Sequence, residues 1–309
     1  MDESTEIAVL GGFGVGKTMY LERYPEPGET VTGGEYREGP GGKASNQAIQ
    51  IRRLGVAANL ITAIGTDSGA ALGRDLWLRE GVNTDGVVVL DAPTMVGFIC
   101  VDSKGDNRIA IAPGALAHMT LADLDGLYPV IDRSAALVVS FELNPLVGFA
   151  AIRHARKQGI TTLCNPAPAT EIPDDVLSCI DYLVPNLSEA AQIVDALGAD
   201  LREPADIARY LLGRGVGTVI ITLGANGVYL DDGQGGAFFT SDLGQQSRRH
   251  DRCGRQLCRS VYERTGERRT GVRSRELRNA SRRYDGGGGR GGSFPALRGK
   301  PDGEKWHRQ

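Results

Sequence analysis

Residues 41–55 read Gly-Gly-Lys-Ala-Ser-Asn-Gln-Ala-Ile-Gln-Ile-Arg-Arg-Leu-Gly. Two glycines precede a segment of helical periodicity, which places Lys43 and Asn46 on the first turn of a predicted helix over 44–54. The amides of a helix start, a cation and a side-chain amide together suit a polyhydroxyl or anionic ligand. Taken alone, the stretch also fits an ordinary capped helix with a solvated lysine.

Strands and helices are predicted to alternate on both sides of this stretch. Short apolar runs are typical of strands, and segments with a period of 3.6 residues lie between them. This order predicts an α/β fold, with a mostly parallel sheet covered by helices on both faces. The predicted strands are Ile7–Leu10, Asn59–Ile64, Ala136–Ser140, Thr161–Cys164, Tyr182–Val184 and Thr218–Thr222. The predicted helices are Ala44–Leu54, Ser68–Glu80, Leu146–Gln158, Ser188–Leu197 and Ala205–Arg214.

One region departs from this alternation. Residues 94–101 and 107–112 have extended character, and they flank Ser103-Lys104-Gly105-Asp106, a sequence typical of a hairpin turn. Together with residues 28–39, they predict a small β-sheet that projects from the main domain as a lid.

Residues 11–18, Gly-Gly-Phe-Gly-Val-Gly-Lys-Thr, match the P-loop pattern and follow a predicted strand. A P-loop requires a helix directly after it, whose first amides bind phosphate. Pro25 and Pro27 leave little room for that helix. We therefore interpret residues 11–18 as a glycine-rich exit from the first strand, with a P-loop nucleotide hydrolase as the alternative.

Three further motifs follow predicted strands. They are Asn-Pro-Ala-Pro-Ala at 165–169, Pro-Asn-Leu-Ser-Glu-Ala at 185–190 and Thr-Leu-Gly-Ala-Asn-Gly at 222–227. Open α/β sheets bind their ligands at the carboxyl ends of parallel strands, so all three motifs are expected at the ligand-binding edge.

Taken together, these motifs resemble those of the ribokinase, or PfkB-type, carbohydrate kinase family. Residues 41–55 resemble its first signature, and Pro-Glu-Pro-Gly-Glu-Thr at 25–30 and the three later motifs follow in the family's order and spacing. The resemblance covers nearly all of residues 5–240. It implies a ribokinase-like three-layer sandwich with a mostly parallel central sheet and a small β lid.

The resemblance also implies a reaction and a set of site residues. The reaction is transfer of a phosphoryl group from ATP, with Mg²⁺, to the hydroxyl of a sugar or nucleoside, and the resemblance allows K⁺ as a further cofactor. The implied substrate-binding residues are Gly41, Gly42, Lys43, Asn46 and Glu142. The implied nucleotide-binding residues are Asn186, Glu189, Thr222, Gly224 and Gly227, of which Asn186 and Glu189 would organise Mg²⁺ through water. Without the resemblance, Glu142 and Glu189 would be ordinary charged residues of a helix or loop.

The chain departs from the family pattern at two positions after the first strand. Ribose-specific members of the family have Asn and Asp there, and these side chains hold sugar hydroxyls. The matching residues are Gly14 and Gly16, which offer only backbone groups. The sequence therefore indicates a sugar kinase but does not indicate ribose as its substrate.

The composition of the chain changes sharply after about residue 240. Residues 248–309 hold 18 of the 35 Lys and Arg and 7 of the 38 Asp and Glu, a net charge of +11 against −14 for the rest. The same segment holds 16 Arg and six Leu, Val, Ile or Phe, too few apolar residues to offset the entropy of ordering it. We predict a domain over 1–240 followed by a disordered Arg- and Gly-rich tail over 241–309.

The family's second signature, a Gly-Ala-Gly-Asp turn that begins a helix, is expected near residue 252. Residues 248–259 instead read Arg-Arg-His-Asp-Arg-Cys-Gly-Arg-Gln-Leu-Cys-Arg. Displacing the reading frame by one base allows Val-Asp-Thr-Thr-Gly-Ala-Gly-Asp-Ser-Phe-Val-Gly, with the catalytic Asp arising at Arg255-Gln256. We interpret the tail as the product of a frameshift near residues 239–242, which removes the catalytic turn.

The sequence predicts a sugar kinase by ancestry that is nearly inactive as written, or a non-catalytic remnant that still binds sugar. The cysteines, 5 in all, show no disulfide pattern, and the start of the chain is polar, so we expect a cytoplasmic protein. We expect no membrane partner and no specific nucleic acid partner, and a homodimer through the lid.

Overall fold

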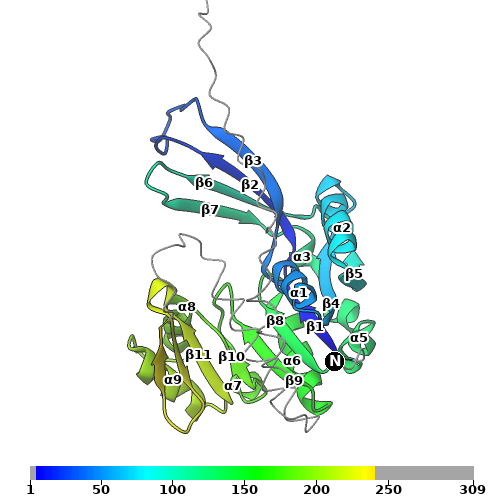
Figure 1. Cartoon of the computed structure of the whole chain (residues 1–309), viewed down its shortest axis with the longest axis vertical. Coiled ribbons are helices and arrows are strands. Elements are labelled where there is room, and N and C mark those ends of the chain that lie inside the picture. Colours follow the sequence, from blue (N-terminus) through cyan, green and yellow to red (C-terminus); the bar gives the residue numbers. More distant parts are fainter. Residues whose placement is uncertain (1–4, 241–309) are drawn as a thin grey trace, which may run out of the picture. The chain divides into compact units, whose positions relative to one another are not determined.

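The computed structural model describes residues 5–240; residues 1–4 and the tail at 241–309 lie outside the described part. Its centre is a sheet of nine strands in the order β13-β12-β11-β10-β9-β8-β1-β4-β5 (Figure 1). The strands are β1 Glu6–Leu10, β4 Ala57–Ile64, β5 Asn83–Val89, β8 Ala136–Ser140, β9 Thr161–Asn165, β10 Tyr182–Leu183, β11 Thr218–Thr222, β12 Val228–Asp231 and β13 Ala237–Phe239.

The sheet is mostly parallel, as predicted. Every pair from β11 across to β5 is parallel, and β12 and β13 add two antiparallel pairs at one edge. Ala8, Val9 and Leu10 of β1 are all fully buried, which explains why this central strand is a continuous apolar run. The sequence did not predict β5, β12 or β13.

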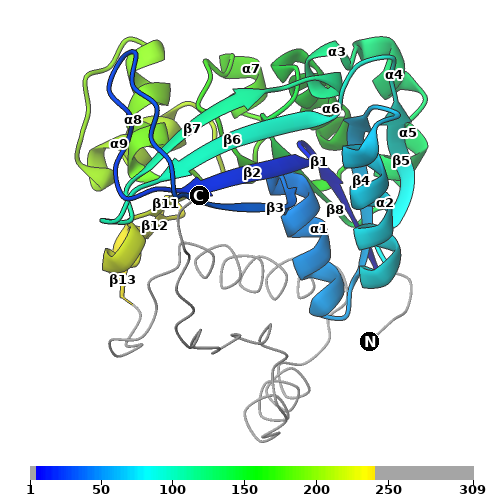
Figure 2. The same ribbon diagram turned by 90° about the horizontal axis from the view of Figure 1, so that it is seen from above.

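Helices cover both faces of the sheet, which makes the predicted three layers. Figure 2 shows α1 on the opposite side of the strands from α6, α8 and α9. The longer helices are α1 Lys43–Arg53, α2 Ser68–Glu80, α6 Pro145–Lys157, α8 Leu187–Ala196 and α9 Pro204–Gly213. The shorter ones are α3 Ala115–His118, α4 Leu121–Asp125, α5 Tyr128–Asp132, α7 Asp174–Leu177 and the 3₁₀ turn η1 Gly224–Asn226.

A second sheet of four strands, in the order β3-β2-β6-β7, is the lid. The predicted hairpin is present as β6 Met95–Val101 and β7 Asn107–Ala112. The expectation for residues 28–39 was wrong in part, since β3 is Glu35–Gly41 and residues 28–34 form no strand. The lid also contains β2, Gly14–Tyr20, which pairs with both β3 and β6. Its glycines obscured the strand because glycine has low β propensity.

Asp67 and Thr94 attach the lid to the main sheet at the start of β6. The Asp67 carboxylate accepts the Thr94 amide at 2.8 Å and the Thr94 hydroxyl at 2.7 Å. The Thr94 hydroxyl oxygen in turn accepts the Gly65 amide at 3.0 Å, just after β4. Asp67 also caps α2, so a single carboxylate joins a lid strand to a helix of the body.

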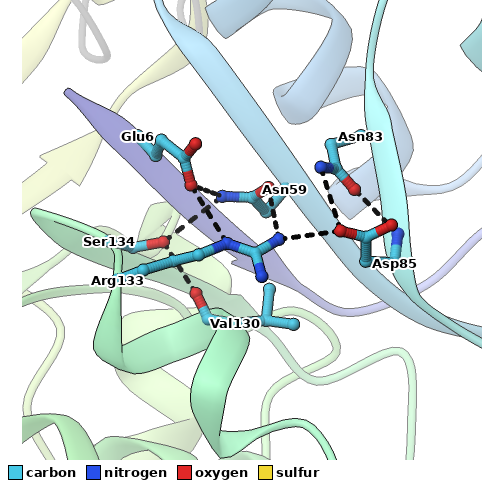
Figure 3. Close-up of polar contacts among 7 residues, drawn as sticks. All are labelled: Glu6, Asn59, Asn83, Asp85, Val130, Arg133 and Ser134. Atoms are coloured by element: carbon cyan, nitrogen blue, oxygen red, sulfur yellow. Dashed lines mark hydrogen bonds and ion pairs between the residues drawn. The ribbon is translucent and has the colours of Figure 1, made fainter. Parts of the chain in front are cut away.

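A polar network ties strands together at the amino edge of the central sheet (Figure 3). Arg133 contacts Glu6 of β1 at 3.1 Å and Asp85 of β5 at 3.1 Å. The buried Asn59 of β4 donates to Glu6 at 2.9 Å and accepts from Arg133 at 3.3 Å. Ser134 completes the network at the entry to β8 by donating to the Val130 carbonyl at 2.9 Å. Side-chain contacts therefore tie β1, β4, β5 and the entry to β8 together at this end of the sheet.

Phe13, Ser45 and Trp77 form a buried contact between the β1–β2 connection, α1 and α2. The Phe13 and Trp77 rings meet edge to face with centroids 4.7 Å apart. The Trp77 indole N–H donates to the Ser45 hydroxyl at 2.8 Å, and both residues are fully buried.

None of the helices formed by residues 5–240 has the length and apolar character needed to cross a bilayer.

Replacing Ser45 with Ala is expected to lower the free energy of unfolding by about 1–3 kcal/mol, because the buried indole N–H loses its acceptor. Urea unfolding followed by circular dichroism measures the change. Ser68→Ala, on the exposed first turn of α2, is the control and should change stability by less than about 0.5 kcal/mol. Equal effects of the two substitutions on the free energy of unfolding would show that the hydrogen bond from Trp77 to Ser45 does not stabilise the fold.

Candidate functional site

The strand order reverses between β1 and β8. From β1 the chain proceeds to β4 and β5 on one side and then to β8–β11 on the other. In open α/β sheets, ligands bind outside the carboxyl ends of the strands at such a reversal. The residues that follow β1 and β8 are therefore the first place to look for a site.

Glu142 and the start of α1 meet at this point. Glu142 lies two residues beyond β8, and its Oε2 accepts the backbone N–H of Lys43 at 2.6 Å. Gly42 has φ of +93° and packs so closely that a Cβ there would lie 2.4 Å from the Gly12 carbonyl oxygen. A Cβ on Gly12 would lie 2.5 Å from the Glu142 carboxylate. Both glycines are therefore needed for the carboxylate to reach the helix.

Burial dominates the electrostatics of Glu142. It raises the pKa of the carboxyl group above its ordinary value, while the Lys43 backbone N–H and the Lys43 charge act in the opposite direction. The carboxylate is held by one oxygen, Oε2, in its contact with Lys43. Such a group can accept hydrogen bonds from the hydroxyl groups of a ligand through its other oxygen.

The structure brings together some of the predicted substrate-binding residues. Gly41, Gly42 and Lys43 are consecutive at the junction of β3 and α1, and Lys43 contacts Glu142. Asn46 lies three residues after Lys43 on the first turn of α1, and it is exposed. Its convergence on the same ligand remains a prediction. Sequence reasoning missed Gly12, whose only signal was the pair of glycines after the first strand.

The predicted nucleotide-binding residues gather beyond β10 and β11. Asn186 and Glu189 form a capping box at the start of α8, in which Asn186 Oδ1 accepts the Glu189 amide and Glu189 Oε2 accepts the Asn186 amide, each at 2.8 Å. Asn186 also forms a parallel bridge with Thr222, the last residue of β11.

Gly224 and Gly227 enclose the turn that follows β11. Both have positive φ, +60° and +89°, and the Leu223 amide donates to the Gly227 carbonyl at 2.8 Å across the turn. The turn leads directly from Thr222, so these three residues share one end of the sheet with Asn186. The five predicted nucleotide-binding residues thus lie on two neighbouring segments.

One strand separates the two groups. Strand β9 lies between β8, which leads to Glu142, and β10, which leads to Asn186. Two strand spacings amount to about 10 Å, measured across the sheet. Such a spacing lets one ligand bind near Glu142 and a second near Asn186 on the same edge.

The described residues offer little for direct metal binding. Between residues 5 and 240, no group of three His, Cys, Asp or Glu side chains could hold an ion. The capping box leaves Glu189 Oε1 outside its two hydrogen bonds, and a carboxylate oxygen suits a hydrated Mg²⁺. Asn186 and Glu189 therefore fit an ion that keeps its water shell.

The P-loop alternative lacks its structural requirement. Lys17 and Thr18 lie in the middle of the lid strand β2, where a P-loop would begin a helix. Lys17 lies 3.8 Å from Glu38 of β3, with both side chains more than a third exposed. Gly14 and Gly16 pair with Gly41 and Gly39 on the same strands. The geometry favours a lid strand in place of a phosphate-binding loop.

Comparison with known proteins agrees with this arrangement. The pattern of the pfkB family carbohydrate kinases matches residues 13–242. The chain belongs to this family. It is 34% identical to the ribokinase of Haemophilus influenzae over 226 residues, which cover 72% of this chain and 74% of that protein.

Two other members of the family show the extent of the match. The chain is 33% identical to the bifunctional ribokinase/ribose-5-phosphate isomerase A of Fructilactobacillus sanfranciscensis, covering 72% of this chain but only 42% of that protein. It also resembles the crystal structure of a ribokinase from Thermotoga maritima, with a TM-score of 0.69 and 28% identity over 79% of each chain. The carbohydrate kinase family and the ribokinase-like fold predicted from the sequence are confirmed.

Replacing Lys17 with Ala should leave the affinity for Mg·ADP within about twofold of the wild type, because Lys17 lies in a lid strand and makes only an exposed ion pair with Glu38, which adds little to stability. Isothermal titration calorimetry on the full chain measures this affinity. A loss of nucleotide binding in this variant alone would restore the P-loop alternative.

Replacing Glu142 with Gln is expected to stabilise the ligand-free protein at about pH 7.5. Since the folded pKa of Glu142 is raised, its carboxyl contributes stability that is fully present below the unfolded pKa and is lost as the pH rises through the folded pKa. Gln avoids the cost of burying the ionised form, so the advantage of the variant should shrink towards about pH 4.

Urea unfolding at several pH values tests this dependence on Glu142. Glu171→Gln, which makes the same substitution at an exposed position, is the matched control. If the stability difference between Glu142→Gln and the wild type stays constant as the pH changes, burial does not raise the pKa of Glu142 in the folded protein.

Proposed function

We propose that residues 5–240 form the substrate-binding part of a sugar kinase that uses ATP and Mg²⁺. Gly41, Gly42, Lys43, Asn46 and Glu142 would hold the sugar or nucleoside acceptor. Thr222, Gly224 and Gly227 would line the nucleotide site. Asn186 and Glu189 would hold Mg²⁺ through its water shell, and the ion would neutralise charge on the ATP phosphates.

The contact between Glu142 and the Lys43 amide is the observation that carries this proposal. It places a carboxylate and a helix start at the reversal of strand order. The capping box of Asn186 and Glu189 lies two strands away, beside Thr222. A sugar hydroxyl bound at the first position and ATP phosphates at the second would meet above β9.

We propose further that this chain binds its ligands but transfers phosphate poorly. Its sequence contains no Gly-Ala-Gly-Asp, and the Asp expected near Arg255-Gln256 is absent. A positioned general base contributes about 10²–10⁴-fold to a rate, and each donor to a developing anion about 10²–10³-fold. Loss of both leaves binding as the remaining property.

Restoring the reading frame by one base near codon 240 is expected to restore sugar-dependent ADP formation, because it rebuilds the Gly-Ala-Gly-Asp turn. A coupled assay across pentoses, hexoses and nucleosides compares the repaired protein with the present chain, which should show almost none. Asp→Asn in the rebuilt turn is the matched control and should abolish activity while leaving thermal unfolding unchanged.

Two results would count against the proposal in different ways. Normal kinase rates in the present chain would show that another carboxylate acts as base. A folded, repaired protein that consumes no ATP with any of these acceptors would remove the substrate assignment.

The lid supports a homodimer as a further part of the proposal. Tyr36, Phe98, Ile109 and Ile111 are each more than half exposed on its strands, and apolar surface of this kind favours association. Sedimentation velocity on the full chain tests the homodimer, and a monomer at all concentrations would exclude it.

K⁺ remains a prediction of the family resemblance.

A further inference from the structure

Besides the bond from the Val184 amide to the Cys164 carbonyl at 2.8 Å, three hydrogen bonds join neighbouring segments at the carboxyl ends of β8, β9, β10 and β11. The Phe141 amide donates to the Ala167 carbonyl at 3.1 Å, and the Thr222 amide donates to the Pro185 carbonyl at 2.9 Å. Between them, Asn165 Nδ2 donates to the Val184 carbonyl at 2.8 Å. These contacts extend the pairing of β8, β9, β10 and β11 into the loops that carry the proposed site.

The segment 165–167 takes part in two of the three contacts. On one side, Ala167 holds Phe141, whose next residue is Glu142. On the other side, Asn165 holds Val184, two residues before Asn186. The Ala167 amide also donates to the Asn165 carbonyl at 2.8 Å, which makes the segment a tight turn. One short turn is therefore attached to both halves of the site.

Asn165 makes the only side-chain contact of these three. Its amide group reaches the carbonyl of Val184, a residue that is 4% exposed. A buried carbonyl that loses its donor is costly, so the Val184–Asn186 backbone should follow the Asn165 side chain. Residues 165–169 stood out in the sequence as a motif, but no role followed from the pattern.

We propose that Asn165 is a positioning residue that sets the place of the Asn186–Glu189 capping box relative to Glu142. This inference rests on the proposed function, which assigns the capping box to Mg²⁺ and nucleotide and Glu142 to the acceptor. Asn165 acts through the Val184 carbonyl and touches neither ligand in this account. Its loss should therefore disturb the nucleotide half of the site and spare the acceptor half.

The test replaces Asn165 with Asp, which has nearly the same shape but cannot donate to Val184. Two amides report on the two halves without any ligand: Glu189 N–H, held by Asn186, and Lys43 N–H, held by Glu142. Hydrogen exchange in the full chain should rise about tenfold at Glu189, the equivalent of one buried hydrogen bond, and stay unchanged at Lys43. The affinity for Mg·ADP should fall by a similar factor.

Asn59→Asp is the matched control, because it also removes a buried amide donor but at the amino edge of the sheet. It should lower the melting temperature, while the ratio of the exchange rates at Glu189 and Lys43 stays at its wild-type value. If Asn165→Asp fails to fold, Asn165→Ser takes its place. The serine hydroxyl is a donor on a shorter side chain, so hydrogen exchange at Glu189 should change in the same direction.

The outcomes separate this inference from the proposed function. Unchanged exchange at Glu189, or an equal rise at Glu189 and Lys43, would overturn the role of Asn165. A wild-type chain that binds no Mg·ADP would overturn the nucleotide assignment, and the exchange rates would still decide whether Asn165 positions the capping box.

Discussion

The parallel pairing of β1 with β4 on one side and β8 on the other is the constraint on which the rest of the structure depends. Ala8, Val9 and Leu10 of β1 are fully buried, and the register of β1 with both neighbours brings the carboxyl ends of the three strands to one edge. The chain leaves β1 through Gly11 and Gly12 and enters the lid directly at β2. Because of this short connection, the lid begins two residues after Gly12, the glycine that packs against Glu142. The reversal of strand order at β1 then decides where a ligand can bind.

The two edges of the sheet are built differently. At the amino edge, Arg133, Glu6, Asp85 and Asn59 satisfy one another and leave a closed polar network. At the carboxyl edge, Glu142 and Glu189 each hold one backbone amide near a helix start by a single oxygen. Groups of the second kind keep capacity for a ligand. This contrast supports the proposal that ligands bind at the carboxyl edge.

Both halves of the proposed site use a carboxylate in the same way. Glu142 accepts an amide at the start of α1, and Glu189 accepts one at the start of α8. The two differ in their surroundings, because burial raises the pKa of Glu142 whereas Glu189 lies on an exposed capping box. A carboxylate whose ionised form is disfavoured by burial is suited to hydroxyl groups, which donate hydrogen bonds to it. The second carboxylate is suited to the water shell of a cation.

The sequence by itself determined the type and place of most elements and the family. The strands at 136–140 and 218–222 and the helix at 68–80 agree with their predictions residue for residue, because buried strands and amphipathic helices carry their periods locally. The motifs at 41–47, 185–190 and 222–227 indicated most of the proposed site residues for the same reason, since each is continuous in the chain. Only the tertiary structure decided the role of residues 14–20, which are a strand because β3 and β6 pair with them over a long separation. It alone showed the contact of Glu142 with Lys43, 99 residues apart, and the hydrogen bond from Asn165 to Val184. Contacts of this kind depend on which strands become neighbours, and no local pattern of residues encodes that choice.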